Sequence, residues 1–271
     1  MKILLKNECD RAFKNKWFYI TMFVCIAIVV YDFCMVALPT RLALEDVYIG
    51  MKDYQVPGVY SRWIEMNIGS SVKLIHFAFP LITCIPYAMS LYSDVKSKYI
   101  YNIITRVDKK KYFLTKIFVQ FMVGFSVVAI TLSLSFVLTA MVLPMEYPLI
   151  SASVYLSTPK CVLVELFTKC PLATTILAIF LESVIFGIIN CIAYVFAYIL
   201  DNGIVVVTSA FTVYFFIHII SQITGLFGLM NCTRILMLNY SYVPELGIEL
   251  LIIIGIVVLT YVLRSRAKDN I

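Results

Sequence analysis

The chain of 271 residues is 62% hydrophobic and 14% charged, with a mean hydropathy of +0.93. Soluble domains average roughly 25% charged residues, so this composition excludes an ordinary soluble domain and indicates a polytopic membrane protein. The formal net charge is +6, but the positive residues are confined to particular loops, so nucleic acid is not expected as a partner.

The N-terminal residues 1–16 are polar and precede an apolar run that is long enough for a membrane span. No small-residue cleavage site follows this run, which distinguishes it from an ordinary signal peptide. We therefore predict a polar N-terminal segment that is followed by an uncleaved membrane anchor.

Six segments are apolar over a length that can cross a hydrocarbon core of about 30 Å, which needs roughly 20 helical residues. They cover about 17–39, 72–92, 113–143, 172–200, 203–228 and 245–263. Pro80 and Pro86 lie within the second segment and are predicted to kink it. The sequence thus predicts an all-α polytopic membrane protein with six transmembrane helices, which form a single transmembrane domain over residues 1–271.

The distribution of Lys and Arg predicts the orientation of these spans. The N-terminal segment, the segment 93–116 and the C-terminal tail would share one side of the membrane and together hold 15 of the 22 cations. The remaining seven are spread over much longer loops on the other side. Because positively charged loops face the cytoplasm, both termini and the segment 93–116 are predicted to be cytoplasmic.

The densest basic cluster, "SLYSDVKSKYIYNIITRVDKKKYFLTK" at 90–116, holds seven cations in 27 residues. Its apolar residues recur at helical spacing and predict a short helix whose start Ser93 or Asp94 would cap. The apolar stripe of that helix comprises Tyr99, Ile100, Ile103, Ile104 and Val107. From the pattern alone, such a stripe can lie on the lipid surface or enter a groove on a cytoplasmic partner.

This segment, together with "ECDRAFKNKWFYI" before the first span, resembles the type-2 ABC exporter permeases, which are six-span bacterial membrane subunits. In that family the N-terminal segment lies as an amphipathic helix along the inner membrane surface, and a coupling helix after the second span docks onto an ATPase. The resemblance places Asp94 at the family's acidic position, 103–106 in the helix, and Tyr112 with Lys116 at the return into the membrane. Lys98 stands where family members often have glycine.

The resemblance implies a permease in the bacterial plasma membrane that acts with two separate ABC ATPase subunits and a second permease copy or a paralogue. ATP and Mg²⁺ would bind to the ATPase partner, because this chain has no phosphate-binding loop, and no cofactor is expected in the chain itself. The favoured substrate is an amphipathic or antimicrobial peptide, and lipid or drug substrates stay open. The link at 229–244 is short for a polysaccharide exporter. The expected coupling interface with the ATPase comprises Asp94, Tyr99, Ile100, Ile103, Ile104, Arg106 and Val107.

Polar residues inside the predicted spans are candidates for the translocation pathway or for a dimer seam. Glu182 falls near the middle of the fourth span, and Asn190 follows eight residues later on roughly the same helix face. Alternatively, a protonated Glu182 bonds a neighbouring helix and only stabilises the bundle. His218 in the fifth span is a further candidate. For His218 and for His76, the sequence fits both a side chain that only hydrogen-bonds a neighbour and a proton relay.

The eight cysteines show no metal-ligand spacing, so no metal site is predicted, and no catalytic residue is predicted either. A disulfide among the loop residues Cys161, Cys170 and Cys232 is left open. Two other functional classes also remain: an ion-coupled secondary transporter, although no inverted repeat is visible, and an intramembrane enzyme, although no set of catalytic groups converges.

Overall fold

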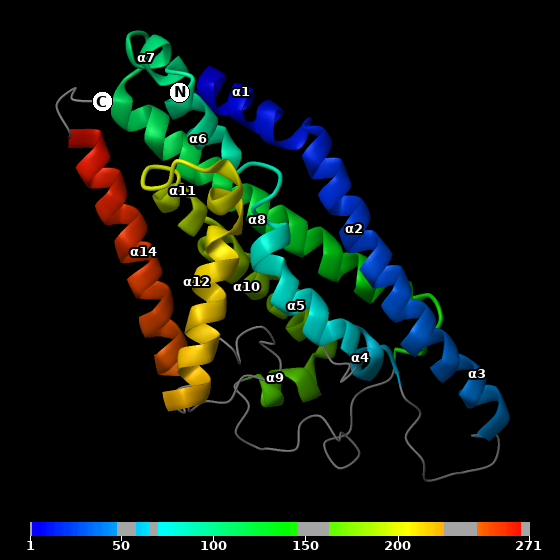
Figure 1. Ribbon diagram of the computed structural model, residues 1–271. Helices are drawn as coiled ribbons and strands as arrows, with labels where there is room; N and C mark the ends of the chain where they lie inside the picture. The colour runs from blue at the N-terminus through cyan, green and yellow to red at the C-terminus, as the bar shows by residue number, and fades with distance from the viewer. Residues whose placement is uncertain (1, 48–57, 65–69, 146–162, 225–242, 267–271) are drawn as a thin grey trace.

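The computed structural model describes residues 2–47, 58–64, 70–145, 163–224 and 243–266. Within these ranges the chain forms helices and turns and no strand (Figure 1). Cys161 and Cys232, together with most of the link 229–244, lie outside the described residues. Cys170 is a free thiol.

Five helical stretches are long and apolar enough to cross a membrane, which supports an α-helical, multi-pass membrane protein. The first combines α2, the π-helical turn η1 and α3, and the third combines α10 and α11. The helices are α2 (Lys16–Asp32), η1 (Phe33–Ala37), α3 (Leu38–Val47), α8 (Lys109–Ala140), α10 (Pro171–Asn190), α11 (Ile192–Phe196), α12 (Gly203–Thr224) and α14 (Val243–Arg266). Two short helices, α4 (Val59–Arg62) and α9 (Val164–Lys169), lie at the lower end of the bundle in Figure 1.

The predicted second span, 72–92, is not one continuous helix. It divides into α5 (Ser70–Ile82) and α6 (Met89–Lys96), which are joined by turns. Proline has no backbone N–H and disfavours helix in the residue before it, so Pro86 between the two helices accounts for the interruption. Neither piece has the length of a full span, and the structure therefore describes five candidate spans where the sequence predicted six.

The long helix α8 lies at the centre of the bundle, with α10 packed along it and with α1 (Lys2–Phe13) and α2 against other parts of its length. The helices α5, α12 and α14 complete the bundle. The largest apolar core lies between α5, α8 and α10, where Phe79, Leu132 and Phe186 are fully buried.

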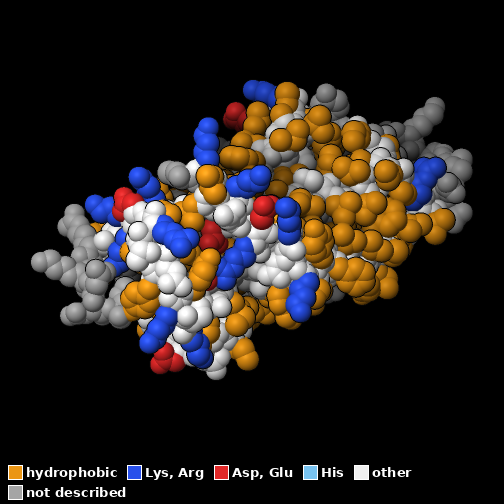
Figure 2. All heavy atoms as spheres, turned by 90° about the horizontal axis from the view of Figure 1, so that it is seen from above, with side chains coloured by type: hydrophobic (Ala, Val, Ile, Leu, Met, Phe, Trp, Pro, Cys, Tyr) orange, Lys and Arg blue, Asp and Glu red, His pale blue; other side chains and the backbone are white. Residues whose placement is uncertain are grey.

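One end of the bundle, here called the basic end, is formed by α1, α7 (Tyr99–Ile104) and the first turn of α8 (Figure 1). Figure 2 looks onto this end and shows Lys and Arg side chains gathered there around a few acidic ones. The helix α1 corresponds to the predicted N-terminal helix, and α7 to the predicted helix in the basic segment.

The start of α7 differs from the predicted one. Ser93 and Asp94 lie inside α6 and do not cap α7, which begins only after a turn at Ser97 and Lys98. The backbone of Lys98 is left-handed, with φ 57° and ψ 13°. Among the described residues other than glycine, only Lys98 has a positive φ. Glycine would therefore suit position 98 better than lysine does.

Replacing Lys98 with glycine is expected to raise the free energy of unfolding by roughly 0.5–1 kcal/mol, because glycine has no Cβ to disfavour the left-handed conformation. Lys98→Ala is the matched control, since alanine also lacks the long side chain but keeps the Cβ. We expect thermal unfolding in detergent to show a higher Tm for the glycine variant only. Equal Tm values for the two variants would contradict this interpretation of the turn.

Candidate functional site

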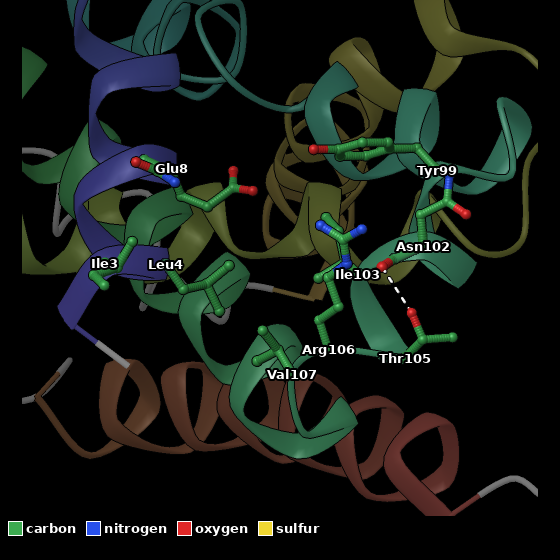
Figure 3. Close-up of a pocket in the computed structure, with 10 residues that line it drawn as sticks. Ile3, Leu4, Glu8, Tyr99, Asn102, Ile103, Thr105, Arg106 and Val107 are labelled. Carbon is green, nitrogen blue, oxygen red and sulfur yellow. Dashed lines mark hydrogen bonds between the residues drawn. The ribbon is translucent and has the colours of Figure 1, made fainter.

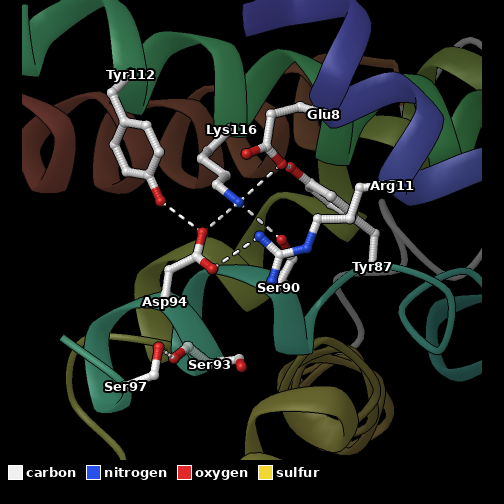
Figure 4. Close-up of polar contacts among 9 residues, drawn as sticks. All are labelled: Glu8, Arg11, Tyr87, Ser90, Ser93, Asp94, Ser97, Tyr112 and Lys116. Atoms are coloured by element: carbon white, nitrogen blue, oxygen red, sulfur yellow. Dashed lines mark hydrogen bonds and ion pairs between the residues drawn. The ribbon is translucent and has the colours of Figure 1, made fainter. Parts of the chain in front are cut away.

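Four charged side chains meet inside the basic end (Figure 4). Lys116 of α8 places its Nζ 2.8 Å from Glu8 Oε2 of α1 and 2.7 Å from Asp94 Oδ2 of α6. Arg11 of α1 donates from Nη1 to Asp94 Oδ1 at 2.7 Å. Lys116 and Asp94 are 1% and 2% exposed, so this ion network joins three helices through a buried centre, while Arg11 at its edge is exposed.

Neutral side chains add further hydrogen bonds to the network. The hydroxyl of Tyr87 donates to Glu8 Oε2 at 2.6 Å, and that of Tyr112 donates to Asp94 Oδ2 at 2.7 Å. Lys116 donates to Ser90 Oγ at 2.7 Å, which engages the third of its three N–H groups. Buried ions need such additional hydrogen bonds, so these residues belong to the network as much as the ions do.

Two acids and two bases make the network neutral overall. Burial alone would raise the pKa of Asp94, but the Lys116 charge and the hydrogen bonds from Lys116, Tyr112 and Arg11 outweigh it, and the net shift is downward. Burial likewise opposes the charge of Arg11, yet the hydrogen bond to Asp94 raises the pKa of its guanidinium. Both groups are therefore ionised throughout the physiological pH range.

The lowered pKa of Asp94 predicts how stability depends on pH. Its folded-state pKa lies below the ordinary value of 3.8, so its contribution is fully present above that value and is lost as the pH falls through the folded-state pKa. We expect the Tm difference between wild type and Asp94→Asn to stay constant from about pH 5 to 8 and to shrink below about pH 4. A difference that shrinks between about pH 6 and 8 would contradict the assignment.

An open pocket of about 810 Å³ lies beside the network, between α1 and the loop helix α7 (Figure 3). Glu8 lines it, so the wall of the pocket and the ion network share a residue. The other lining residues are Ile3, Leu4 and Asn7 of α1, and Tyr99, Asn102, Ile103, Thr105, Arg106 and Val107 from α7 and the turn after it. The mixture of apolar and polar side chains fits a segment of another protein as well as a small molecule.

The predicted coupling residues divide into an outer and an inner group. Tyr99 is 49% exposed and Arg106 is exposed, while Ile103, Ile104 and Val107 are half-buried. Ile100 is buried in a core cluster with Tyr112 and Phe113 of α8, and Asp94 is buried in the ion network. The stripe therefore faces this chain's own helices on one side, and mainly Tyr99, Ile103, Arg106 and Val107 remain to line the pocket.

Sequence reasoning missed Glu8 and Arg11 as members of this site and named Lys116 only as a point of return into the membrane. One signal was available, because Glu8 and Arg11 stand three residues apart in a helix and so share a face. Nothing local pointed to their partners, since Asp94 lies 83 residues beyond Arg11 and Lys116 lies 108 residues beyond Glu8.

The predicted residues within the spans lie elsewhere in the bundle. Asn190 and Gln120 join α10 to α8: Gln120 Nε2 donates to Asn190 Oδ1 at 2.9 Å, and Asn190 Nδ2 donates to the Gln120 carbonyl at 2.8 Å. Glu182 and Asn190 are both 0% exposed, and Glu182 lies 3.6 Å from His76. His218 is half-buried on α12, with its ring 6.2 Å from that of Phe77. A role in a translocation pathway stays a prediction for all three.

Comparisons with known proteins place no further constraint on the function, since no family model, no curated protein and no solved structure matches the chain. Among the described residues, no group of three or more His, Cys, Asp or Glu side chains could hold a metal ion. The geometry at the basic end and inside the bundle is therefore the basis for the functional argument.

Proposed function

We propose that this chain is the membrane-embedded permease subunit of an ATP-driven exporter, and that separate ATPase subunits act on it through α7. The observation that carries the proposal is the ion network, which fastens the helix next to α7 to the long helix α8. In this proposal ATP and Mg²⁺ bind to the ATPase, a second permease copy or a paralogue completes the pore, and an amphipathic peptide is the favoured substrate.

A force applied to α7 would reach the spans along a short path. Only Ser97 and Lys98 separate α7 from α6, and α6 carries Asp94. Lys116, the partner of Asp94, stands eight residues into the 32-residue helix α8. Separating two buried ions costs several kcal/mol, about 3–5 when one partner is lost, so α6 and α8 would move together rather than slide apart.

The pocket between α1 and α7 supplies a place for the partner to engage. Its volume of about 810 Å³ exceeds that of a single side chain, and it opens at the basic end next to exposed residues such as Arg106. Apolar walls with a few polar groups are typical of sites that bind a helix or loop of another protein. The occupant would also contact α1, so that it engages α7 together with one of the three helices that the ion network joins.

The proposal is tested by extracting the tagged chain from its native membranes in mild detergent, identifying what co-purifies, and assaying ATP hydrolysis. The variant Tyr99→Ala with Arg106→Glu alters two exposed residues of the pocket wall and leaves the core intact. Lys110→Glu is the control, because it changes the charge of an exposed residue at the same end but outside the pocket.

We expect a stoichiometric ATPase chain with the wild type and with Lys110→Glu, and a loss of at least about tenfold in the recovered ATPase with the double variant, the effect of removing roughly 1.4 kcal/mol of binding free energy. A well-folded wild-type protein that brings no ATPase and hydrolyses no ATP would overturn the proposal. Recovery that the double variant does not reduce would remove α7 as the docking element.

A further inference from the structure

A second open pocket, of about 600 Å³, lies between the junction of α1 with α2 and the first turns of α12. The interruption between α5 and α6, together with the first turns of α6, forms the rest of its wall. Asn15, which precedes α2, donates from Nδ2 to the Pro86 carbonyl at 3.2 Å and so joins two of these walls. The pocket shares no described lining residue with the one between α1 and α7, so it is a separate candidate site.

Two candidate membrane spans begin at this pocket. Trp17, which lines it, is the second residue of the span Lys16–Ala43. Ile204, on the opposite wall, is the second residue of the span Gly203–Ile220. Trp17 is 48% exposed, and tryptophan concentrates where the headgroups of a bilayer meet its hydrocarbon. The pocket therefore faces the headgroup region of one leaflet.

The polar side chains of the wall suit an anion. Among the described lining residues, Arg11 is the only charged one. Arg11 reaches from α1 toward α6 and donates from Nη1 to Asp94, which is buried and does not line the pocket (Figure 4). A guanidinium has five N–H donors, so the bond to Asp94 leaves others for a ligand. The exposed Ser93 hydroxyl and the indole N–H of Trp17 add two further donors to the wall.

The charges around the pocket do not reverse this preference. Those within three positions of a lining residue in the sequence are Glu8, Asp10, Lys14, Lys16, Asp94, Lys96 and Asp201. Glu8 and Asp94 are held by Lys116 and Arg11 in the ion network, and Asp10 pairs with Lys14 at 2.9 Å. With Arg11 and Lys116 included, five cations stand against four acids, and the exposed Lys16 lies next to Trp17.

We propose that this pocket binds an anionic phospholipid of the surrounding bilayer, with the phosphate on Arg11 and the acyl chains along the first turns of α12. Ile204 and Val207 of α12 supply the apolar wall, and Ile204 is 72% exposed. Basic pockets between membrane-spanning helices are typical sites for lipid headgroups. Because no described lining residue is a carboxylate, the ammonium group of a zwitterionic lipid would find no ion partner here, and an anionic headgroup is favoured.

A bound lipid would contact α1, α2, α6 and α12 at once and thus connect elements that are far apart in the sequence. It would also sit against the interruption between α5 and α6, where Pro86 and Tyr87 line the pocket. The inference requires only that the chain lies in a bilayer, so it stands independently of the exporter proposal.

The test uses Trp17 as the reporter, in the whole chain reconstituted into lipid nanodiscs. Phosphatidylglycerol or phosphatidylcholine, brominated near the top of the acyl chains, is added at equal mole fractions to unbrominated phosphatidylcholine, and quenching of tryptophan fluorescence gives their relative binding constants. The chain has two tryptophans, and the other, Trp63, is 0% exposed. Trp17→Phe should therefore remove the lipid-dependent quenching, and quenching that persists in this variant would overturn the site.

We expect phosphatidylglycerol to bind about fivefold more tightly than phosphatidylcholine, the contribution of one basic side chain near a membrane surface. Arg11→Gln should reduce this preference to within about twofold. Ser93→Glu, which adds a carboxylate to the wall at an exposed position, should do the same and decides the question if Arg11→Gln does not fold. Lys110→Gln is the matched control, because it lowers the net charge by the same amount at an exposed residue outside the pocket.

Two results would overturn the lipid site. One is equal binding of the two lipids, or a preference that Ser93→Glu and Lys110→Gln reduce to the same extent, since the pocket would then make no contribution of its own. The other comes from glycerol 3-phosphate, which has the phosphate without acyl chains. If it relieved the quenching as readily as unbrominated phosphatidylglycerol does, the ligand would be a soluble phosphate and not a lipid.

Discussion

Replacing Lys116 with methionine is expected to lower the free energy of unfolding by about 3–5 kcal/mol, the usual cost of breaking a buried ion pair by removing one partner. Lys116 is 1% exposed and holds both Glu8 and Asp94, so its loss leaves two buried carboxylates with only Arg11 to compensate them. Methionine keeps most of the side-chain volume, and the change therefore tests the charge and not the packing.

The measurement is Tm in detergent, where a loss of this size corresponds to a fall on the order of 10 °C for a chain of this length. Lys111→Met is the control, because Lys111 is exposed at the same end of α8 and its loss should stay within about 0.5 kcal/mol. Adding Glu8→Gln to Lys116→Met should recover part of the loss, since Asp94 then still pairs with Arg11 and no buried carboxylate lacks a cation. A Lys116→Met variant as stable as the control would refute the network.

The sequence predicted the helical, membrane-embedded class of the fold because apolar runs are local features. Residues 113–143 and 245–263 correspond to α8 and α14 because nothing in those runs interrupts a helix. The run 72–92 is apolar throughout, and a kink was predicted there from Pro80 and Pro86. The structure divides the run into α5 and α6 around Pro86, so a sixth span stays a prediction.

The ion network could not be predicted from the sequence for a related reason. Charged residues in a basic segment look like a solvated face, and only the tertiary structure reveals that Asp94 and Lys116 are buried. Their partners lie 83 and 108 residues away, in α1, so no local pattern connects them. The left-handed backbone of Lys98 was not predicted from the sequence either, because a lysine rarely adopts this conformation.

The helices α8 and α10 approach so closely that a single methyl group is expected to separate them. A Cβ added at Gly124 of α8 would lie 2.8 Å from Asn190 Cβ and 2.9 Å from its amide nitrogen, closer than side-chain carbons pack. Gly124→Ala would therefore displace Asn190 from Gln120, at a cost of about 1–3 kcal/mol from overpacking, to which disturbed buried hydrogen bonds add.

A second glycine provides the comparison. A Cβ added at Gly255 of α14 meets nothing within 4 Å, so Gly255→Ala introduces the same methyl group without a clash. That variant should be neutral, or more stable by up to about 1 kcal/mol, because alanine favours helix over glycine. We expect unfolding in detergent to give opposite shifts for the two variants. Equal shifts would mean that α8 and α10 are not held at this distance by the absence of a side chain at residue 124.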